Sequence, residues 1–254
     1  MVRAAGEKLL HRLASQEVSG TQNVERSPDS AEALKDQGTK YFHAGKLSAA
    51  GSYYRRAILA KPDFAEAHNN LGTVLRKRGS PQSAIASFQT ALLLNPQSGS
   101  TYGNLGNLHE RYGNLAQAET YYLKAVALSP ELYQGFVGLA RIAAGRQRWE
   151  EALGALTRAS AIAPQSASIL HQTGVVYLSK GDLPAALNNL LNATSLEPKN
   201  AVIKACLADV LYRQGKTDEA RVQAEESLAI DPSESVAKMV LEKISAPDAD
   251  PPQT

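Results

Sequence analysis

The chain has 254 residues, of which 43% are hydrophobic and 6% aromatic. Its 27 basic and 25 acidic residues leave a formal net charge of +2 at pH 7, a balance that excludes a nucleic-acid binder acting through overall charge. A single cysteine, Cys206, excludes an intramolecular disulfide framework and a Cys-rich zinc site.

Residues 1–30 precede the first regular pattern and are predicted to form a disordered or frayed leader. Residues 1–14 place Leu9 and Leu13 near one helical face beside basic side chains, as a mitochondrial presequence does. Glu7 and the missing apolar core of a signal peptide argue against a targeting role. The whole sequence lacks the roughly 18 consecutive apolar residues of a membrane span, so we predict no membrane insertion and a cytoplasmic location.

From residue 31 to residue 234 the sequence repeats with a period of 34 residues. Position 32 of every repeat is proline, a coincidence with a chance on the order of 10⁻⁶ when proline is about 5% of ordinary sequence. We therefore predict six repeats, at 31–64, 65–98, 99–132, 133–166, 167–200 and 201–234. Positions within a repeat are counted below from its first residue.

Each repeat alternates small and bulky residues at helical spacing. Position 20 is alanine in all six repeats, and positions 8 and 27 are glycine, alanine or serine. Small residues at fixed positions allow two helices to approach closely. Glycine at position 15 of five repeats predicts the end of a first helix, and the proline at position 32 predicts the end of a second. Repeat 4 departs from this pattern, because Gln147 stands where the glycine is expected.

After the sixth repeat, residues 235–245 are predicted to form a helix that caps the last hydrophobic face. Val236, Met239, Val240 and Ile244 occupy one side of this helix. Residues 246–254, which contain three prolines, are predicted to be a disordered tail.

Catalytic and metal-binding signatures are incomplete wherever they begin. Gly215-Lys216-Thr217 resembles the end of a phosphate-binding loop, but the first glycine of that motif would fall at Val210. His109-Glu110 begins a zinc-helix motif whose second histidine would fall at Gly113. We therefore predict a protein that is not an enzyme and that has no cofactor and no metal.

The composite pattern L-G-x-x-Y, A-x-x-x-F, A and P resembles the tetratricopeptide-repeat family. Repeats 2 and 3 match best, with AEAHNNLGTVLRKRG and TYGNLGNLHERYG. The resemblance covers 204 of the 254 residues, from 31 to 234. It implies an all-α solenoid of six helix-turn-helix repeats in a right-handed superhelix, whose concave wall is lined by positions 2, 5, 6, 9, 12 and 13 of the first helices.

Those positions predict a peptide-binding groove with two chemically different halves. Amides, which both donate and accept hydrogen bonds, and arginines, which bind carboxylates, characterise repeats 2–4. The polar residues are Asn69, Asn70, Thr73, Arg76, Lys77, Asn104, Asn107, Glu110, Arg111 and Arg141. In repeats 4–6 the same positions are mostly apolar, which often marks a contact surface. They are Val137, Ala144, Val175, Leu178, Val202, Ala205 and Tyr212.

Two relatives within the family sharpen these expectations. Chaperone-binding members hold a C-terminal carboxylate with five residues, and this chain offers Lys35, Thr39, Asn70, Ser100 and Asn104, of which only Lys35 and Asn70 match. Asn70 and Asn104 also resemble the asparagine ladder in the repeat arm of O-linked N-acetylglucosamine transferases. Gly138 breaks that ladder in repeat 4, and no transferase domain follows.

We therefore predict a non-catalytic scaffold or adaptor that binds a peptide segment or a helix of another protein. Two alternatives stay open: a subunit that brings substrates to a separate enzyme such as a glycosyltransferase, and a homo-oligomer that assembles through the apolar wall of repeats 5 and 6. Nucleic acid is excluded as a partner, because few aromatic residues are present to stack on bases.

Overall fold

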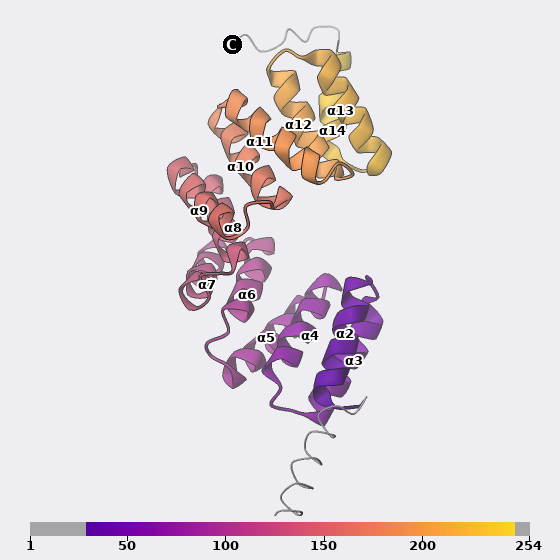
Figure 1. Cartoon of the computed structure of the whole chain (residues 1–254), viewed down its shortest axis with the longest axis vertical. Helices are drawn as coiled ribbons and strands as arrows, with labels where there is room; N and C mark the ends of the chain where they lie inside the picture. Colours follow the sequence, from indigo (N-terminus) through magenta and orange to yellow (C-terminus); the bar gives the residue numbers. More distant parts are fainter. Residues whose placement is uncertain (1–28, 247–254) are drawn as a thin grey trace, which may run out of the picture. The chain divides into compact units, whose positions relative to one another are not determined.

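The computed structural model describes residues 29–246, and this part of the chain contains thirteen α-helices and no strand (Figure 1). The all-α prediction is confirmed. The predictions for residues 1–28 and 247–254 lie outside the described residues. The helices are α2 (Ala31–His43), α3 (Leu47–Ala60), α4 (Ala65–Lys77), α5 (Pro81–Leu94), α6 (Gly99–Arg111), α7 (Leu115–Leu128), α8 (Tyr133–Gly145), α9 (Trp149–Ile162), α10 (Ala167–Lys180), α11 (Leu183–Leu196), α12 (Ala201–Arg213), α13 (Thr217–Ile230) and α14 (Ser235–Ser245).

The even-numbered helices from α2 to α12 are the first helices of the repeats, and the odd-numbered helices from α3 to α13 are the second helices. Each first helix begins at the residue where a 34-residue period begins. α14 spans the residues predicted to cap the stack and packs against α12 and α13, burying Ala237 and Val240 completely.

The turns inside the repeats explain the glycine at position 15. Gly45, Gly79, Gly113, Gly181 and Gly215 all have φ between 72° and 90°. Gln147 takes the same left-handed conformation in repeat 4, with φ of 59°. A residue with a Cβ atom pays roughly 1–2 kcal/mol in this conformation. The turn geometry is therefore kept in repeat 4 at the cost of local strain.

Close packing between the two helices of a repeat explains the small positions. All six alanines at position 20 are fully buried. A Cβ atom added to Gly38, Gly72 or Gly174 would lie 2.7 Å from a side-chain carbon of the facing second helix. Ser227 replaces alanine at position 27 without leaving a buried polar group unsatisfied, because its hydroxyl donates to the Ala201 carbonyl at 2.8 Å.

The chain divides into two compact units, residues 1–112 (unit 1) and 113–254 (unit 2). The described part of unit 1 holds α2 to α6, and that of unit 2 holds α7 to α14. The boundary falls in the turn of repeat 3, between Tyr112 and Gly113. In both units neighbouring helices pack in chain order, as in α2 on α3 and α3 on α4.

Candidate functional site

In unit 1 the asparagines of α4 and α6 form a hydrogen-bonded relay. The Asn104 side-chain amide donates to Asn69 Oδ1 at 2.9 Å, and Asn69 in turn donates to Asn70 Oδ1 at 3.4 Å. All three side chains are half-buried. The relay joins position 6 of one repeat to positions 5 and 6 of the repeat before it. It therefore orients the amides and links two neighbouring first helices.

A second contact between the same helices lies nearer their C-terminal ends. Arg76 Nη1 donates to Asn107 Oδ1 at 2.9 Å. Thr73 donates to the backbone carbonyl of Asn69 at 3.2 Å, which directs its methyl group away from the helix backbone. Four asparagines, Thr73 and Arg76 thus form one polar surface across α4 and α6. We call Asn69, Asn70, Asn104 and Asn107 the amide band.

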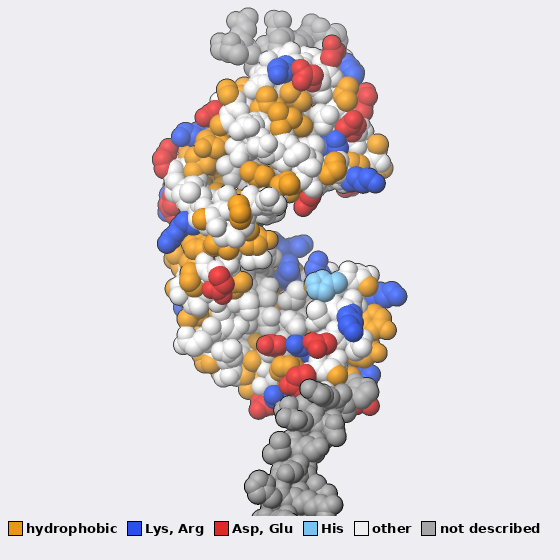
Figure 2. Space-filling model, viewed as in Figure 1, with side chains coloured by type: hydrophobic (Ala, Val, Ile, Leu, Met, Phe, Trp, Pro, Cys, Tyr) orange, Lys and Arg blue, Asp and Glu red, His pale blue; other side chains and the backbone are white. Residues whose placement is uncertain are grey.

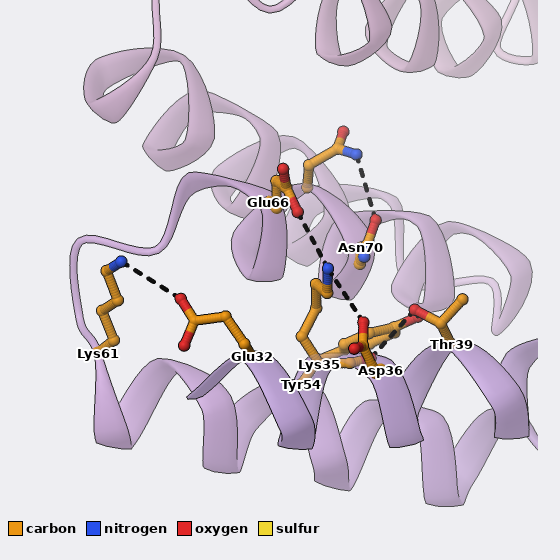
Figure 3. A network of polar contacts seen from close by, with 9 residues as sticks. Glu32, Lys35, Asp36, Thr39, Tyr54, Lys61, Glu66 and Asn70 are labelled. Atoms are coloured by element: carbon orange, nitrogen blue, oxygen red, sulfur yellow. Dashed lines mark hydrogen bonds and ion pairs between the residues drawn. The ribbon is translucent and has the colours of Figure 1, made fainter. Parts of the chain in front are cut away.

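An acidic and basic network adjoins the amide band at the α2–α4 contact (Figure 3). Lys35 Nζ lies 3.1 Å from Asp36 and 3.3 Å from Glu66. Partial burial opposes the charge of Lys35, but the hydrogen bonds and attraction from these two carboxylates outweigh it and raise its pKa. A partner's carboxylate would have to displace both. Lys35, one of the two residues matching a chaperone carboxylate clamp, is thus occupied by the chain's own acids.

Lys77 and Arg111 are the last residues of α4 and α6, and both are exposed. Lys77 Nζ lies 5.5 Å from the centre of the Phe42 ring of α2, a distance typical of a cation–π contact. The last two polar candidates of unit 1 therefore lie at the C-terminal end of the first helices, beside the amide band.

In unit 2 the row of asparagines at position 6 is interrupted by Gly138, and the reason is steric. A Cβ atom at Gly138 would lie 2.3–2.6 Å from three atoms of the Tyr122 ring, which reaches across from α7. The Tyr122 hydroxyl accepts a hydrogen bond from Arg141 Nη2 at 3.3 Å. A tyrosine of a second helix therefore takes the place that the ladder asparagine has in repeats 2 and 3. Arg141 is held against this tyrosine.

Of the seven residues predicted to form an exposed apolar wall in repeats 4–6, three are buried instead. Val137, Leu178 and Ala205 are buried with exposed fractions of 5%, 9% and 0%. Leu178 belongs to the hydrophobic core formed with α11 to α14, so stacking of successive repeats covers it. Val175 and Ala144 are half-buried, and only Val202 is exposed, at 47%. Tyr212 is half-buried, with Lys243 of α14 5.8 Å from its ring centre.

Unit 2 contains a relay that sequence reasoning missed. His171 Nε2 lies 3.4 Å from Cys206 Sγ, and Gln172 Nε2 lies 3.5 Å from His171 Nδ1. These residues occupy positions 5, 6 and 6, the same positions as Asn69, Asn70 and Asn104. Burial lowers the pKa of His171, and burial with nearby carboxylates raises the pKa of Cys206 to about 12. The thiol therefore stays protonated, unlike the thiolate of a cysteine nucleophile.

The sequence did contain a sign of this relay, because its residues stand at the same repeat positions as Asn69, Asn70 and Asn104. The change of residue type from asparagine to histidine and cysteine concealed it. Position 9 of repeat 6 also carries a polar group that was not predicted. Asp209 is buried and pairs with Arg213 at 2.9 Å. Polar residues thus continue along the first helices of unit 2, but they bond to one another.

The structure therefore places nine of the seventeen predicted groove residues in unit 1 and the other eight in unit 2. Arg141 contacts Tyr122 there, while Val175, Leu178 and Tyr212 lie on α10 and α12. Within residues 29–246, no helix has the length and apolar character to cross a bilayer. Groups of three His, Cys, Asp or Glu placed to hold a metal are also lacking in this described part.

A family model described as the cilia and flagella-associated protein 70 C-terminal domain matches residues 4–240. A search of curated protein sequences gave no significant match.

Several solved structures share the fold. A chain in the crystal structure of the APC/C hetero-tetramer Cut9-Hcn1 has a TM-score of 0.82 and 23% identity over 89% of this chain. This chain spans 45% of the length of that one. The type IV pilus biogenesis factor PilW has a TM-score of 0.72, 19% identity, and coverage of 83% of this chain and 98% of its own. PilF of Pseudomonas aeruginosa has a TM-score of 0.70, 16% identity, and coverage of 84% and 97%.

Proposed function

The chain belongs to the family of cilia and flagella-associated protein 70 C-terminal domains, which are tetratricopeptide-repeat domains, and from this premise we propose that it is a non-catalytic scaffold that binds an extended segment of a partner protein. The first helices of repeats 1–3 supply the binding face. The amide band carries the proposal, because its side chains have both donors and acceptors for a peptide backbone.

Preorganisation supports this assignment. The bonds from Asn104 to Asn69 and from Arg76 to Asn107 fix the side chains before a partner arrives. Binding then immobilises fewer side chains, which otherwise costs roughly 0.5–1.5 kcal/mol for each flexible one. The half-buried state of the amides leaves part of each group accessible to a ligand.

The state of Cys206 supports the non-catalytic part of the proposal as far as a thiol nucleophile is concerned. The one thiol has its pKa raised to about 12. Burial also disfavours self-assembly through the apolar wall of repeats 5 and 6, because Leu178 and Ala205 of that wall are buried. A subunit that brings substrates to a separate enzyme would use the same amide band, and the experiment below tests it as well.

The test compares two triple variants of the full chain. Asn70→Ala, Asn104→Ala and Arg111→Ala alter the proposed face. Asn188→Ala, Asn192→Ala and Arg221→Ala remove the same residue types from exposed sites on the second helices α11 and α13. Partners are identified by affinity purification and mass spectrometry, and a peptide from each is then titrated by calorimetry.

We expect the first triple to weaken peptide binding at least about tenfold, the equivalent of 1.4 kcal/mol, and the second to leave it unchanged. Circular dichroism checks that both variants keep the wild-type helix content. Equal affinity of a folded first triple and the wild-type chain would contradict the assignment of the face. A recovered enzyme whose substrate binds here would favour the targeting role.

The family name also suggests a location. We propose that the chain works at cilia or flagella, in place of a general cytoplasmic distribution. Imaging of the tagged chain in ciliated cells, beside a tubulin marker of the ciliary shaft, tests this, and signal confined to the cell body would contradict it.

A further inference from the structure

The three first helices of unit 1 all end on a basic or imidazole side chain. α2 ends at His43, α4 at Lys77 and α6 at Arg111, which are position 13 of repeats 1, 2 and 3. All three residues are exposed. We call them the basic edge. Position 13 of repeats 4 and 5 is Gly145 and Ser179, so the row is interrupted after α6. In repeat 6 the same position is Arg213, which pairs with Asp209.

Helix stability alone does not account for the basic edge. Cations near a helix C-terminus are favourable by about 0.3–1 kcal/mol, because they complement the helix dipole. That effect would act on every helix of the chain equally. Yet none of the six second helices carries a basic residue in its last turn. Among the first helices of unit 2, α10 and α12 also end on a cation, but Lys180 pairs with Glu150 and Arg213 pairs with Asp209. Among these described helix ends, the basic residues without an acidic partner are those beside the amide band.

Acidic residues are segregated from the basic edge. The sequence contains no Asp or Glu between residues 67 and 109. Glu32 and Glu66 lie in the first turns of α2 and α4, and Asp36 lies in the middle of α2. Glu66 and Asp36 pair with Lys35, and Glu32 pairs with Lys61. Glu110, which precedes Arg111, is the acid nearest in sequence to the edge. Figure 2 shows a histidine of unit 1 with basic side chains beside it and the acidic ones elsewhere on that unit.

Within the described residues, Lys77 and Arg111 take part in no ion pair. The contact of Lys77 with the Phe42 ring holds the ammonium in place and leaves its hydrogen-bond donors available. Arg111 adds a planar guanidinium that can bind a carboxylate with two parallel hydrogen bonds. The edge therefore supplies two uncompensated cations and an imidazole in one row.

The spacing of this row fits an extended chain. Packed helices lie roughly 8–10 Å apart, and an extended peptide advances about 3.3–3.6 Å per residue. Three residues of an extended peptide thus span the step from one first helix to the next. We propose that the basic edge binds an extended acidic segment of a partner protein that carries Asp or Glu at about every third residue, with its backbone along the amide band. This inference rests on the proposed function and adds the chemistry of the ligand.

The probe is a set of synthetic, fluorescein-labelled ten-residue peptides titrated against the full chain by fluorescence anisotropy. One peptide has Glu at positions 2, 5 and 8 in a Ser and Pro background. A second has the same composition with three consecutive Glu residues, and a third has Lys in place of Glu. A single-stranded oligonucleotide of equal length serves as a different polyanion.

The variants are matched in residue type. Lys77→Gln with Arg111→Gln neutralises the basic edge, and Lys199→Gln with Arg221→Gln neutralises one exposed lysine and one exposed arginine of unit 2. We expect the spaced acidic peptide to bind at least about tenfold more tightly than the other peptides. The first double variant should lose at least about tenfold in affinity, and the second should lose none. Raising salt should weaken wild-type binding, because the Debye length falls from about 10 Å at 0.1 M to about 3 Å at 1 M.

Equal binding of the spaced and consecutive peptides would overturn the proposal, as would equal losses in the two double variants. Tighter binding of the oligonucleotide at the same residues would replace the acidic peptide by a nucleic acid. If no acidic peptide binds while the Asn70, Asn104 and Arg111 triple still weakens a native partner's peptide, only this inference fails. If neither effect is seen, the proposed function fails with it.

Discussion

Every first helix occupies the same place in its repeat, but the polar side chains of repeats 2 and 3 make different contacts from those of repeats 4 to 6. In α4 and α6, asparagines bond across the helix contact and stay half-exposed beside Lys77 and Arg111. In α8, α10 and α12, the corresponding positions are filled by a tyrosine from α7, by core residues, or by groups that pair with a neighbour, such as buried Asp209 with Arg213.

The difference shows that a repeat scaffold tolerates both solutions, since position 6 accepts whatever shape the preceding second helix leaves. The Tyr54 ring of α3 lies against Gly38 of its own repeat, and the next first helix carries Asn70 at position 6. The Tyr122 ring of α7 lies over Gly138 of the next first helix, where an added Cβ atom would overlap it. The end of the amide band at α8 is therefore a consequence of packing by the preceding second helix.

The largest effect should come from Phe88, which is fully buried in unit 1. Phe88→Ala should lower the free energy of unfolding by about 3–5 kcal/mol, through lost burial and an empty cavity. The single tryptophan, Trp149, lies in unit 2 and reports on that unit by fluorescence, while circular dichroism reports on both units. We expect the circular dichroism signal of the variant to fall at a lower urea concentration than its Trp149 fluorescence signal.

Leu190→Ala in unit 2 is the matched control, with an expected loss of about 2–5 kcal/mol that both signals should follow. Should Phe88→Ala shift the Trp149 transition as far as the circular dichroism transition, units 1 and 2 would unfold as one. That result would show that the two units do not differ in stability independently of each other.

Restoring the ladder asparagine in repeat 4 tests why the amide band ends. Gly138→Asn should destabilise unit 2 by about 1–3 kcal/mol, because its Cβ atom overlaps the Tyr122 ring. Thermal unfolding followed by Trp149 fluorescence measures the change. Adding Tyr122→Leu to this variant should recover part of the loss by making space. A stable Gly138→Asn single variant would show that the ring moves aside readily.

The strained turn of repeat 4 should be repairable. Gln147→Gly should raise the free energy of unfolding by about 1 kcal/mol, since glycine adopts positive φ without steric cost. Gly79→Gln in unit 1 is the reverse change and should lower it by a similar amount, because its φ of 73° disfavours a Cβ atom. Both are read from urea midpoints, and a destabilised Gln147→Gly variant would assign the glutamine a stabilising contact instead.

The smallest effect is a pH dependence from the His171 relay. Burial lowers the pKa of His171, an effect that attraction from Glu197 only partly offsets. The folded chain therefore takes up this proton less readily than the unfolded chain, whose histidine titrates near about 6.5. The contribution to stability is complete above that pH and is lost as the pH falls through it.

His171→Gln should accordingly reduce the drop in unfolding midpoint between about pH 8 and about pH 5.5. His43→Gln, at an exposed site of unit 1, is the control and should leave the drop as in the wild-type chain. An unchanged pH profile in the His171 variant would mean that other groups cause the dependence.

The 34-residue repeat could be recognised from the amino-acid sequence alone. Proline at position 32, alanine at position 20 and glycine at position 15 each carry a local geometric demand, so the helices and their turns follow from residue type. Gln147 shows how strong that demand is, because the turn forms even where the preferred residue is missing. The division into repeats 31–234 and the identity of the bound partner stay predictions.

The candidate site was only half predictable. Positions 5, 6, 9, 12 and 13 placed the polar residues of α4 and α6 on one face, because helical periodicity alone decides which side chains share a face. It could not reveal that Lys35 is occupied by Glu66 and Asp36, or that Leu178 is covered by the next hairpin. Those outcomes depend on residues one repeat away.

By itself, then, the sequence of this protein determined an all-α solenoid of helical hairpins, since each repeat carries its own turn, packing and stop residues. Only the tertiary structure decided which polar side chains stay partly exposed and which are covered or bonded within the fold. The reason is that burial and hydrogen bonding are properties of neighbouring helices. Tyr122 over Gly138, and His171 against Cys206, meet only when repeats stack.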